Sequence, residues 1–158
     1  MKKYVVLTLV LALTLALSSC FTPANQTQLG DTAYSIVLPE GYVSGEDEFA
    51  EDQIAYFYKD DESVDFDVYQ WEKGEDFTLE SEANHYAAEY GTTAEPVTVN
   101  GISGWKYVSV EDYEGLSYTV VNYMFEDDTY ILEICFWTID TEAEYEVVDG
   151  ILKTLKKS

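Results

Sequence analysis

The chain of 158 residues contains no arginine and only eight lysines, against 31 acidic residues. Its formal net charge is −23. Because proteins attract nucleic acids mainly through basic side chains on the phosphates, this deficit argues against a nucleic-acid partner. Aromatic residues make up 15% of the chain, which is more than a disordered acidic protein carries. The length therefore indicates one folded domain with its own core.

Histidine and cysteine are almost as scarce. His85 is the single histidine, and it lies off the apolar stripe of its helix, so we interpret it as solvated rather than as a zinc ligand. Cys135 lies in the apolar run 130–137 and is interpreted as a small buried hydrophobe, because a reactive thiol needs a base and an electropositive setting.

Motifs of known chemistry are also missing from the sequence. There is no glycine-rich nucleotide loop, no zinc-protease motif and no nucleophile elbow. We therefore predict no catalytic residue, no cofactor and no metal site. Calcium at the acidic turns 60–62 and 126–128 is a weaker alternative, since neither turn follows the known calcium-loop pattern.

The N-terminus has the features of a targeting segment. A short basic start precedes the apolar run Tyr4–Leu17, which is too short to cross a bilayer that needs about 20 helical residues. Leu17-Ser18-Ser19-Cys20 then resembles the lipobox of bacterial lipoproteins. The resemblance implies cleavage after Ser19 and attachment of membrane lipid at Cys20. The alternative is an ordinary secreted protein with a chance cysteine there.

These features divide the chain into three parts: a lipoprotein signal peptide (1–19), a lipidated N-terminus with a flexible tether (20–32), and a folded domain (33–158). Two acyl chains anchor a protein stably, where one is marginal. Removal of the signal peptide also removes two lysines, which makes the net charge of the mature domain still more negative. An anionic membrane surface would therefore repel this domain. We expect it on the outer face of a bacterial cytoplasmic membrane.

Hydrophobic patterning predicts an α+β fold. Short strands with turn signals indicate a mostly antiparallel sheet, with a meander through the second half of the chain. An amphipathic helix follows Thr78, and a second helix begins at Thr141 with Glu144 completing a capping box.

Two sets of residues are candidates for a functional site. In the strand 63–71, Asp65, Asp67, Tyr69 and Trp71 alternate with apolar residues, and we predict that they form an exposed strip for contact with a partner, unless other elements cover it. Elsewhere, Asn122 and Glu133 are lone polar residues in apolar strands.

The second set depends on the register of one hairpin. A two-residue turn at Asp127-Asp128 would place Asn122 directly opposite Glu133, as a buried polar pair. Such a pair is either a structural hydrogen bond or the polar centre of a pocket.

The order of the motifs resembles small bacterial lipoproteins with the PsbP-like fold, an antiparallel sheet sandwiched by two helices. The likeness covers roughly 33–156, and the motifs that carry it are Leu-Pro-Glu-Gly-Tyr at 38–42, Asn-Gly at 100–101 before Trp105, Phe-Trp-Thr at 136–138 and Ile-Leu-Lys-Thr-Leu at 151–155. The fold is named for a photosystem II extrinsic protein and is shared with a nuclear-import factor that binds the Ran GTPase. The resemblance implies a non-enzymatic, partner-binding role and transfers no functional residue.

The sequence thus favours a lipid-anchored binding or interaction module of unknown ligand. A basic protein or a cell-wall component is the kind of partner that so acidic a surface would attract. Two alternatives stay open, a small cell-surface hydrolase acting on carbohydrate and a ligand-capturing lipoprotein. A concave pocket with converging carboxylates would favour the hydrolase, and a flat aromatic patch would favour the module.

Overall fold

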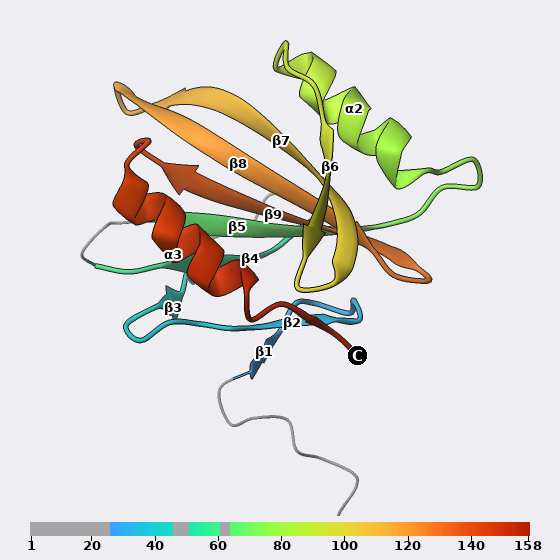
Figure 1. Ribbon diagram of the computed structural model, residues 1–158, viewed down its shortest axis with the longest axis horizontal. Helices are drawn as coiled ribbons and strands as arrows, with labels where there is room; N and C mark the ends of the chain where they lie inside the picture. The colour runs from blue at the N-terminus through green and yellow to red at the C-terminus, as the bar shows by residue number, and fades with distance from the viewer. Residues whose placement is uncertain (1–25, 46–50, 61–63) are drawn as a thin grey trace, which may run out of the picture.

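The described part of the chain forms two antiparallel sheets and two helices (Figure 1). The computed structural model describes residues 26–45, 51–60 and 64–158. The large sheet has the strand order β3-β4-β5-β9-β8-β7-β6, and the small sheet has the order β1-β2-β10. The elements are β1 (Gln26–Gln28), β2 (Tyr34–Val37), β3 (Val43–Ser44), β4 (Gln53–Tyr58), β5 (Asp65–Glu72), α2 (Leu79–Glu89), β6 (Glu95–Val99), β7 (Ile102–Tyr113), β8 (Leu116–Glu126), β9 (Tyr130–Thr138), α3 (Glu142–Leu152) and β10 (Lys156–Lys157).

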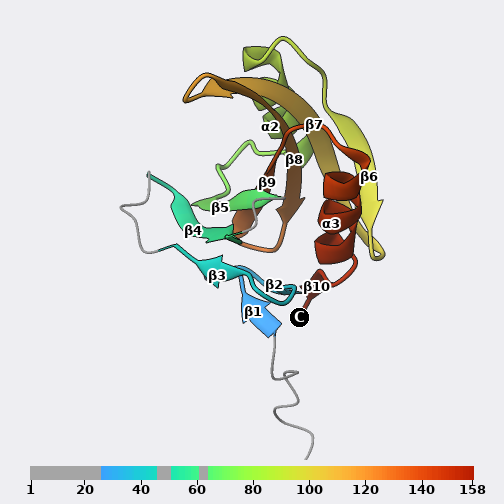
Figure 2. The same cartoon turned by 90° about the vertical axis from the view of Figure 1, so that its left-hand side faces the viewer.

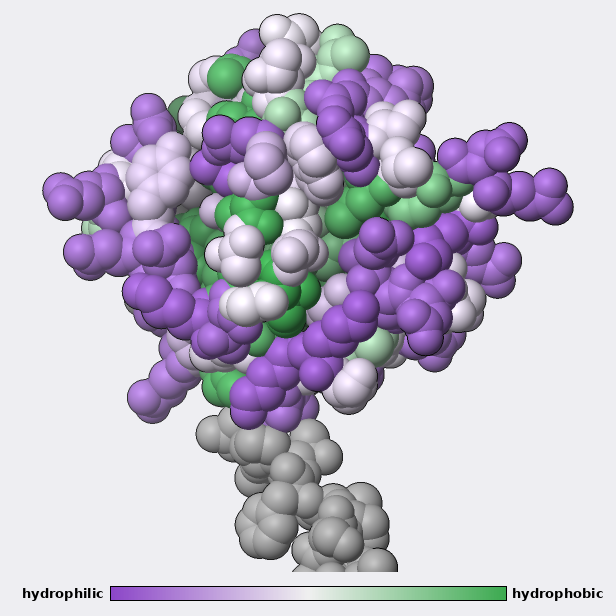
Figure 3. All heavy atoms as spheres, turned by 45° about the vertical axis from the view of Figure 1, so that its right-hand side comes forward, coloured by the Kyte–Doolittle hydropathy of each residue, from purple (hydrophilic) through white to green (hydrophobic). Residues whose placement is uncertain are grey.

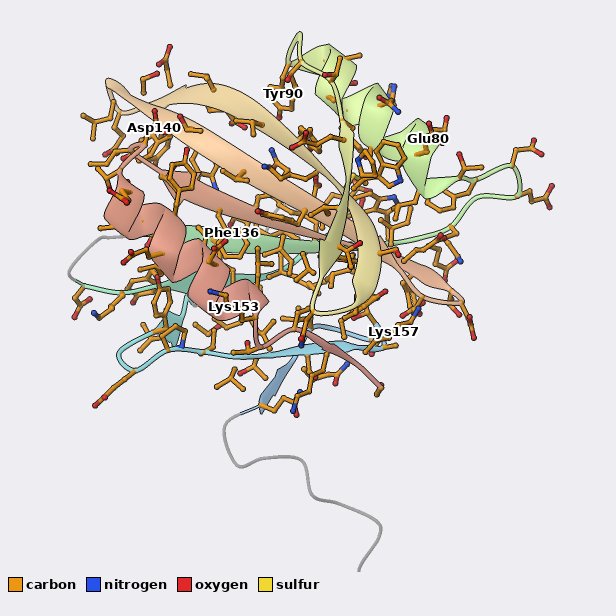
Figure 4. The ribbon with its side chains drawn as sticks, in the orientation of Figure 1. Glu80, Tyr90, Phe136, Asp140, Lys153 and Lys157 are labelled. Atoms are coloured by element: carbon orange, nitrogen blue, oxygen red, sulfur yellow. The ribbon has the colours of Figure 1, made fainter. Side chains whose placement is uncertain are left out.

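The two helices lie on opposite sides of the large, strongly curved sheet (Figure 2). α3 and the small sheet cover one face, where the main core includes the fully buried Phe66, Phe136 and Ile151. Phe136 lies beneath α3 in Figure 4. α2 covers only part of the other face, through Ala83 and Ala87 packed with Met124. This arrangement confirms the predicted α+β fold, a meander sandwiched by two helices.

Local sequence explains where the elements form. On β5 the apolar Phe66 and Val68 face the main core, while the alternate residues face the α2 side. Thr78 caps α2 by accepting a hydrogen bond from Ser81 N at 3.1 Å. Thr141 and Glu144 form the predicted capping box of α3.

The folded domain begins earlier than the predicted boundary at residue 33. Gln26–Gln28 form β1, which pairs with β2, and Leu29 is 1% exposed. Ala33 N also donates to Asp127 Oδ2 at 2.7 Å. The tether expected over 20–32 is therefore wrong for residues 26–32, because burial of one apolar side chain and strand pairing hold them. Cys20 and the segment predicted to be a signal peptide lie outside the described residues.

The predicted register of the β8–β9 hairpin is wrong by two residues. Asn122 lies opposite Cys135, and Glu133 lies opposite Met124. The turn falls at 128–129, because Asp127 pairs with Tyr130 and its N–H donates to Tyr130 O at 3.0 Å. A shift of two residues leaves each side chain on its predicted face of the sheet, so Asn122 and Glu133 still share one face as diagonal neighbours.

Candidate functional site

The part of the sheet that α2 leaves uncovered is hollowed by two adjoining cavities of about 330 and 310 Å³, which share Asp67 and Trp137 as walls. The first lies over β4, β5 and the far end of the β7–β8 hairpin. The second reaches from there to α2 and contains Asn122 and Glu133. Below, "the open face" means the side chains that line these two cavities.

Strand pairing brings the two predicted sets of residues together. On β5, Asp67 lies opposite Cys135 of β9, and Tyr69 lies opposite Glu133. Asp67, Tyr69 and Trp71 therefore line the same cavity as Asn122 and Glu133, and Asp65 lines the neighbouring one. The strip is partly covered, which is the alternative that the sequence left open. Asp67 is 8% exposed and its three companions are half-buried, because the curved sheet and α2 enclose them.

Asp67 is fixed by side chains from both neighbouring strands. Its Oδ1 accepts a hydrogen bond from Gln53 Nε2 at 2.6 Å, and its Oδ2 accepts one from Trp137 Nε1 at 2.7 Å. Burial raises the pKa of the Asp67 carboxyl, and although the Trp137 bond opposes this, the nearby Asp65 and Glu111 add to the increase. Asp67 is thus a rigid carboxylate in a negative environment.

Glu133 is the most buried carboxylate of the open face, at 6% exposed. Its Oε1 accepts a hydrogen bond of 2.6 Å from the Tyr107 hydroxyl of β7. Burial raises the pKa of Glu133 from its ordinary value of 4.5 to about 7, with the Tyr107 bond opposing the increase and Glu82 adding to it. This side chain can therefore change charge near neutral pH.

Asn122 does not partner Glu133 by hydrogen bonding. Its Nδ2 makes only long bonds, to Ser109 Oγ at 3.4 Å and Val120 O at 3.3 Å. Tyr107, rather than Asn122, supplies the partner that the buried Glu133 needs. Tyr107 lies opposite Asn122 on the other side of β8, and its hydroxyl reaches across β8 to Glu133 on β9.

Aromatic rings form much of the cavity walls. Trp71 and Tyr86 meet edge to face at 5.8 Å between ring centroids, and so do Trp137 and Tyr118. Tyr90, at the C-terminal end of α2 (Figure 4), stacks on Tyr107 at 6.3 Å. Such walls offer both ring faces and hydroxyl groups to a ligand.

The open face has no positive charge of its own. Among the described residues that line the two cavities, none is lysine or histidine. The second cavity, by contrast, is lined by five carboxylates: Glu51, Asp52, Asp67, Glu111 and Glu133. On the face drawn in Figure 3, hydrophilic side chains dominate the outer parts and surround a central patch that is partly hydrophobic.

The other candidates from the sequence have ordinary environments. Cys135 is 8% exposed, and burial together with Glu133 raises the pKa of its thiol, so it is a poor nucleophile. His85 is exposed and pairs with Glu89 at 3.5 Å.

In the acidic turn at 126–128, the carboxylate of Asp127 is used within the turn. Burial tends to raise the pKa of Asp127, but hydrogen bonds from the backbone of Tyr130, Thr129 and Ala33 lower it below its ordinary value. Its oxygens therefore serve the turn. Residues 61–62 lie outside the described residues, and within the described ones no group of three or more His, Cys, Asp or Glu could hold a metal ion.

Three residues of this site, Tyr107, Glu111 and Trp137, were not predicted from the sequence. Glu111 lies within β7, which continues to Tyr113, and the turn that follows is the pair Glu114-Gly115, both with positive φ. Tyr107 and Trp137 were not among the predicted site residues. Alternation along β7, which places Trp105, Tyr107, Ser109 and Glu111 on one face, was the signal that could have identified them.

Comparisons with known proteins establish the fold. No protein-family model matches the chain, and no curated protein matches it in sequence. Among solved structures, the PsbP protein of Synechocystis sp. PCC 6803 (CyanoP) matches with a TM-score of 0.51 at 14% identity, over 90% of this chain and 99% of that one. LpqN, described as involved in cell envelope biogenesis of Mycobacterium tuberculosis, matches with a TM-score of 0.56 at 11% identity, over 86% of each chain.

A third structure, from Bacteroides thetaiotaomicron VPI-5482, matches with a TM-score of 0.59 at 16% identity, over 79% of this chain. This chain spans only 45% of the length of that protein. Identities this low show the fold alone, and the fold is PsbP-like. Neither helix in the described part of the chain is long and apolar enough to cross a membrane.

Proposed function

We propose that this protein is a lipid-anchored, extracytoplasmic binding module whose ligand occupies the open face of the large sheet. One observation carries the proposal. Aromatic and carboxylate side chains from β4, β5, β7, β8, β9 and α2 converge on two adjoining cavities that no other described element covers. Concave sites with a few convergent polar groups are the usual places for ligands.

The proposed anchor and the open face are compatible in space. The described chain enters the fold at β1, which lies at the opposite end of the molecule from α2 in both ribbon views (Figures 1 and 2). Lipid attached at Cys20, shortly before β1, would leave α2 and the cavities beside it away from the membrane. The charge supports this orientation, since an anionic surface would repel so acidic a domain.

The fold adds support for the proposed extracytoplasmic setting. Its structural neighbours include LpqN, which is described as involved in cell envelope biogenesis, an extracytoplasmic setting like the one proposed here. The described residues form a single domain, whereas the receptors that capture solutes for transporters usually have two lobes.

A carbohydrate hydrolase is the second candidate, because Asp67 and Glu133 converge in one cavity and are both buried. Hydrolysis of a glycosidic bond needs one carboxylic acid and one carboxylate, so the environments of such a pair drive their pKa values apart. Here burial raises the pKa of both groups.

Substitutions at the rim of the cavities test the proposal. Tyr113 lines the first cavity and is 62% exposed, whereas Val110 is on the same strand, faces the other side and is 68% exposed. The assay is crosslinking in intact cells, followed by identification of the ligand or partner that stays bound to the lipidated wild-type protein. We expect Tyr113→Arg to abolish this capture. We expect Val110→Arg to leave it unchanged. Equal capture by both variants would refute the assignment of the open face.

A further inference from the structure

We propose that the cavity around Glu133 binds an organic cation, an ammonium group held between carboxylates and aromatic rings. This inference rests on the proposed function, because it assigns a ligand class to the same open face. It depends on three features of the cavity: buried acceptors with unused capacity, aromatic walls and uncompensated negative charge.

Two acceptors on deeply buried side chains retain unused capacity, and the Nε1 donor of Trp71 on the same wall also has no partner among the described residues. Tyr107 donates to Oε1 of Glu133, and no other group among the described residues donates to this carboxylate. Asn122, 3% exposed, uses its Nδ2 as a donor, while its Oδ1 accepts no hydrogen bond within the same part of the chain. Both residues line the cavity. Buried acceptors normally find donors, so a ligand that donates or carries positive charge would complete this site.

The walls have the composition of a cage for a cation. Six aromatic residues surround the cavity: Tyr69 and Trp71 from β5, Tyr86 and Tyr90 from α2, Tyr107 from β7 and Trp137 from β9. The face of each ring carries partial negative charge, which attracts ammonium groups and is the means by which aromatic cages recognise quaternary amines. At about 310 Å³ the cavity is at the lower end of the range for ligand pockets, roughly 300–1,000 Å³, which suits a compact headgroup.

Charge distinguishes a cation from a neutral sugar, which would also stack on aromatic rings. Five carboxylates line this cavity, and among its described lining residues there is no cationic side chain to balance them. A buried carboxylate is costly without a positive partner. A cation would remove that cost, and a neutral sugar would leave it in place. The raised pKa values of Glu133 and Asp67 agree with this interpretation.

Cations paired with neutral isosteres provide the test. Choline is compared with 3,3-dimethylbutan-1-ol, which replaces its nitrogen by carbon. The peptide acetyl-Gly-Lys-Gly-amide is compared with its norleucine counterpart. Binding to the full mature chain is measured by calorimetry and by tryptophan fluorescence, since Trp71 and Trp137 line the cavity. We expect at least one cation to bind about tenfold or more tightly than its isostere. The pair that discriminates identifies the source, a free quaternary amine or a lysine side chain of a partner.

Matched variants locate the binding. Glu133→Gln should weaken the cation about tenfold or more and leave the isostere unaffected. Glu146→Gln, an exposed carboxylate on α3 at the other side of the sheet, makes the same change in net charge and should leave both affinities unchanged. Tyr90→Ala, at a half-exposed ring of the wall, is a second variant that does not alter a buried polar group. It should also weaken the cation.

Equal affinities within both pairs, or tight binding of a neutral oligosaccharide without either cation, would overturn the inference. These results are distinguishable from failure of the proposed function. If Tyr113→Arg abolishes capture in cells while no cation is preferred, the open face is the binding site but its ligand is not a cation. If Tyr113→Arg has no effect on capture, the proposed function itself fails.

Discussion

The hydroxyl of Tyr107 on β7 donates a hydrogen bond of 2.6 Å to Oε1 of Glu133 on β9, across the intervening strand β8. This bond connects two residues that are 26 positions apart in sequence, and it fixes the most buried carboxylate of the open face. It also favours the ionised form of Glu133 against the effect of burial.

Removal of this hydroxyl should raise the pKa of Glu133 further. In Tyr107→Phe the carboxylate loses the donor that stabilises its charge, so we expect the pKa to rise above about 7. Carbon-13 NMR titration of the glutamate side chains measures it. We also expect a loss of about 1–3 kcal/mol in the free energy of unfolding, since a buried acceptor is left without its partner. An unchanged or lower pKa would contradict the role of the bond.

The stability of the protein should depend on the protonation of Glu133. The folded state holds this proton up to about pH 7, whereas the unfolded chain releases it near the ordinary value of 4.5. The proton on Glu133 therefore makes its full contribution to the free energy of unfolding below pH 4.5. This contribution, roughly 3 kcal/mol, is lost as the pH rises to about 7.

Urea unfolding at pH 5 and pH 8 measures this loss, with Glu133→Gln and Glu146→Gln compared to the wild type. Glu133→Gln should reduce the difference in stability between the two pH values. A smaller difference remains because the raised pKa of Asp67 acts in the same direction. Identical pH profiles for all three proteins would refute the assignment.

Part of this site could be predicted from the sequence. Alternation along β5 correctly put Asp65, Asp67, Tyr69 and Trp71 on one face, because side chains of a strand point alternately to its two sides. The same rule put Asn122 and Glu133 on a common face, even with the wrong register.

The rest depends on contacts that alternation does not encode. The register of the β8–β9 hairpin depends on the side chain of Asp127, whose Oδ1 accepts hydrogen bonds from Thr129 N and Tyr130 N. These bonds place the turn one residue later than the sequence predicts. The enclosure of Asp67 depends on sheet curvature and on the position of α2, and both are set by long-range packing. Tyr56 of β4 lines the first cavity, and Tyr90 at the end of α2 lines the second. No local sequence pattern marks either residue as part of the site.

The turn residue Asp127 itself should be important for stability. Its carboxylate accepts backbone hydrogen bonds from Thr129, Tyr130 and Ala33, so Asp127→Ala should lower the free energy of unfolding by about 2 kcal/mol. Asp128→Ala is the control, an exposed carboxylate in the same turn, and should change stability by less than about 0.5 kcal/mol. Chemical denaturation of both variants measures the two effects. Similar losses in the two would show that the carboxylate of Asp127 is not what holds the turn.

Lipidation at Cys20 can be tested by fractionation. We expect Cys20→Ser to abolish the membrane association of the mature protein, either by releasing it or by leaving the signal peptide uncleaved. Immunoblots of membrane and soluble fractions report both size and location. A variant of mature length that still sediments with membranes would rule out a lipid anchor at this residue.

Site-specific photo-crosslinking tests the central claim, that the open face holds the ligand. A photoreactive phenylalanine analogue replaces Tyr113 at the rim of the cavities or Val110 on the opposite side of the same strand. After irradiation of intact cells, mass spectrometry of the purified protein identifies covalent adducts. The account predicts a specific adduct from position 113 and none from position 110. An adduct from position 110 alone would place the binding surface on the other face and contradict the account.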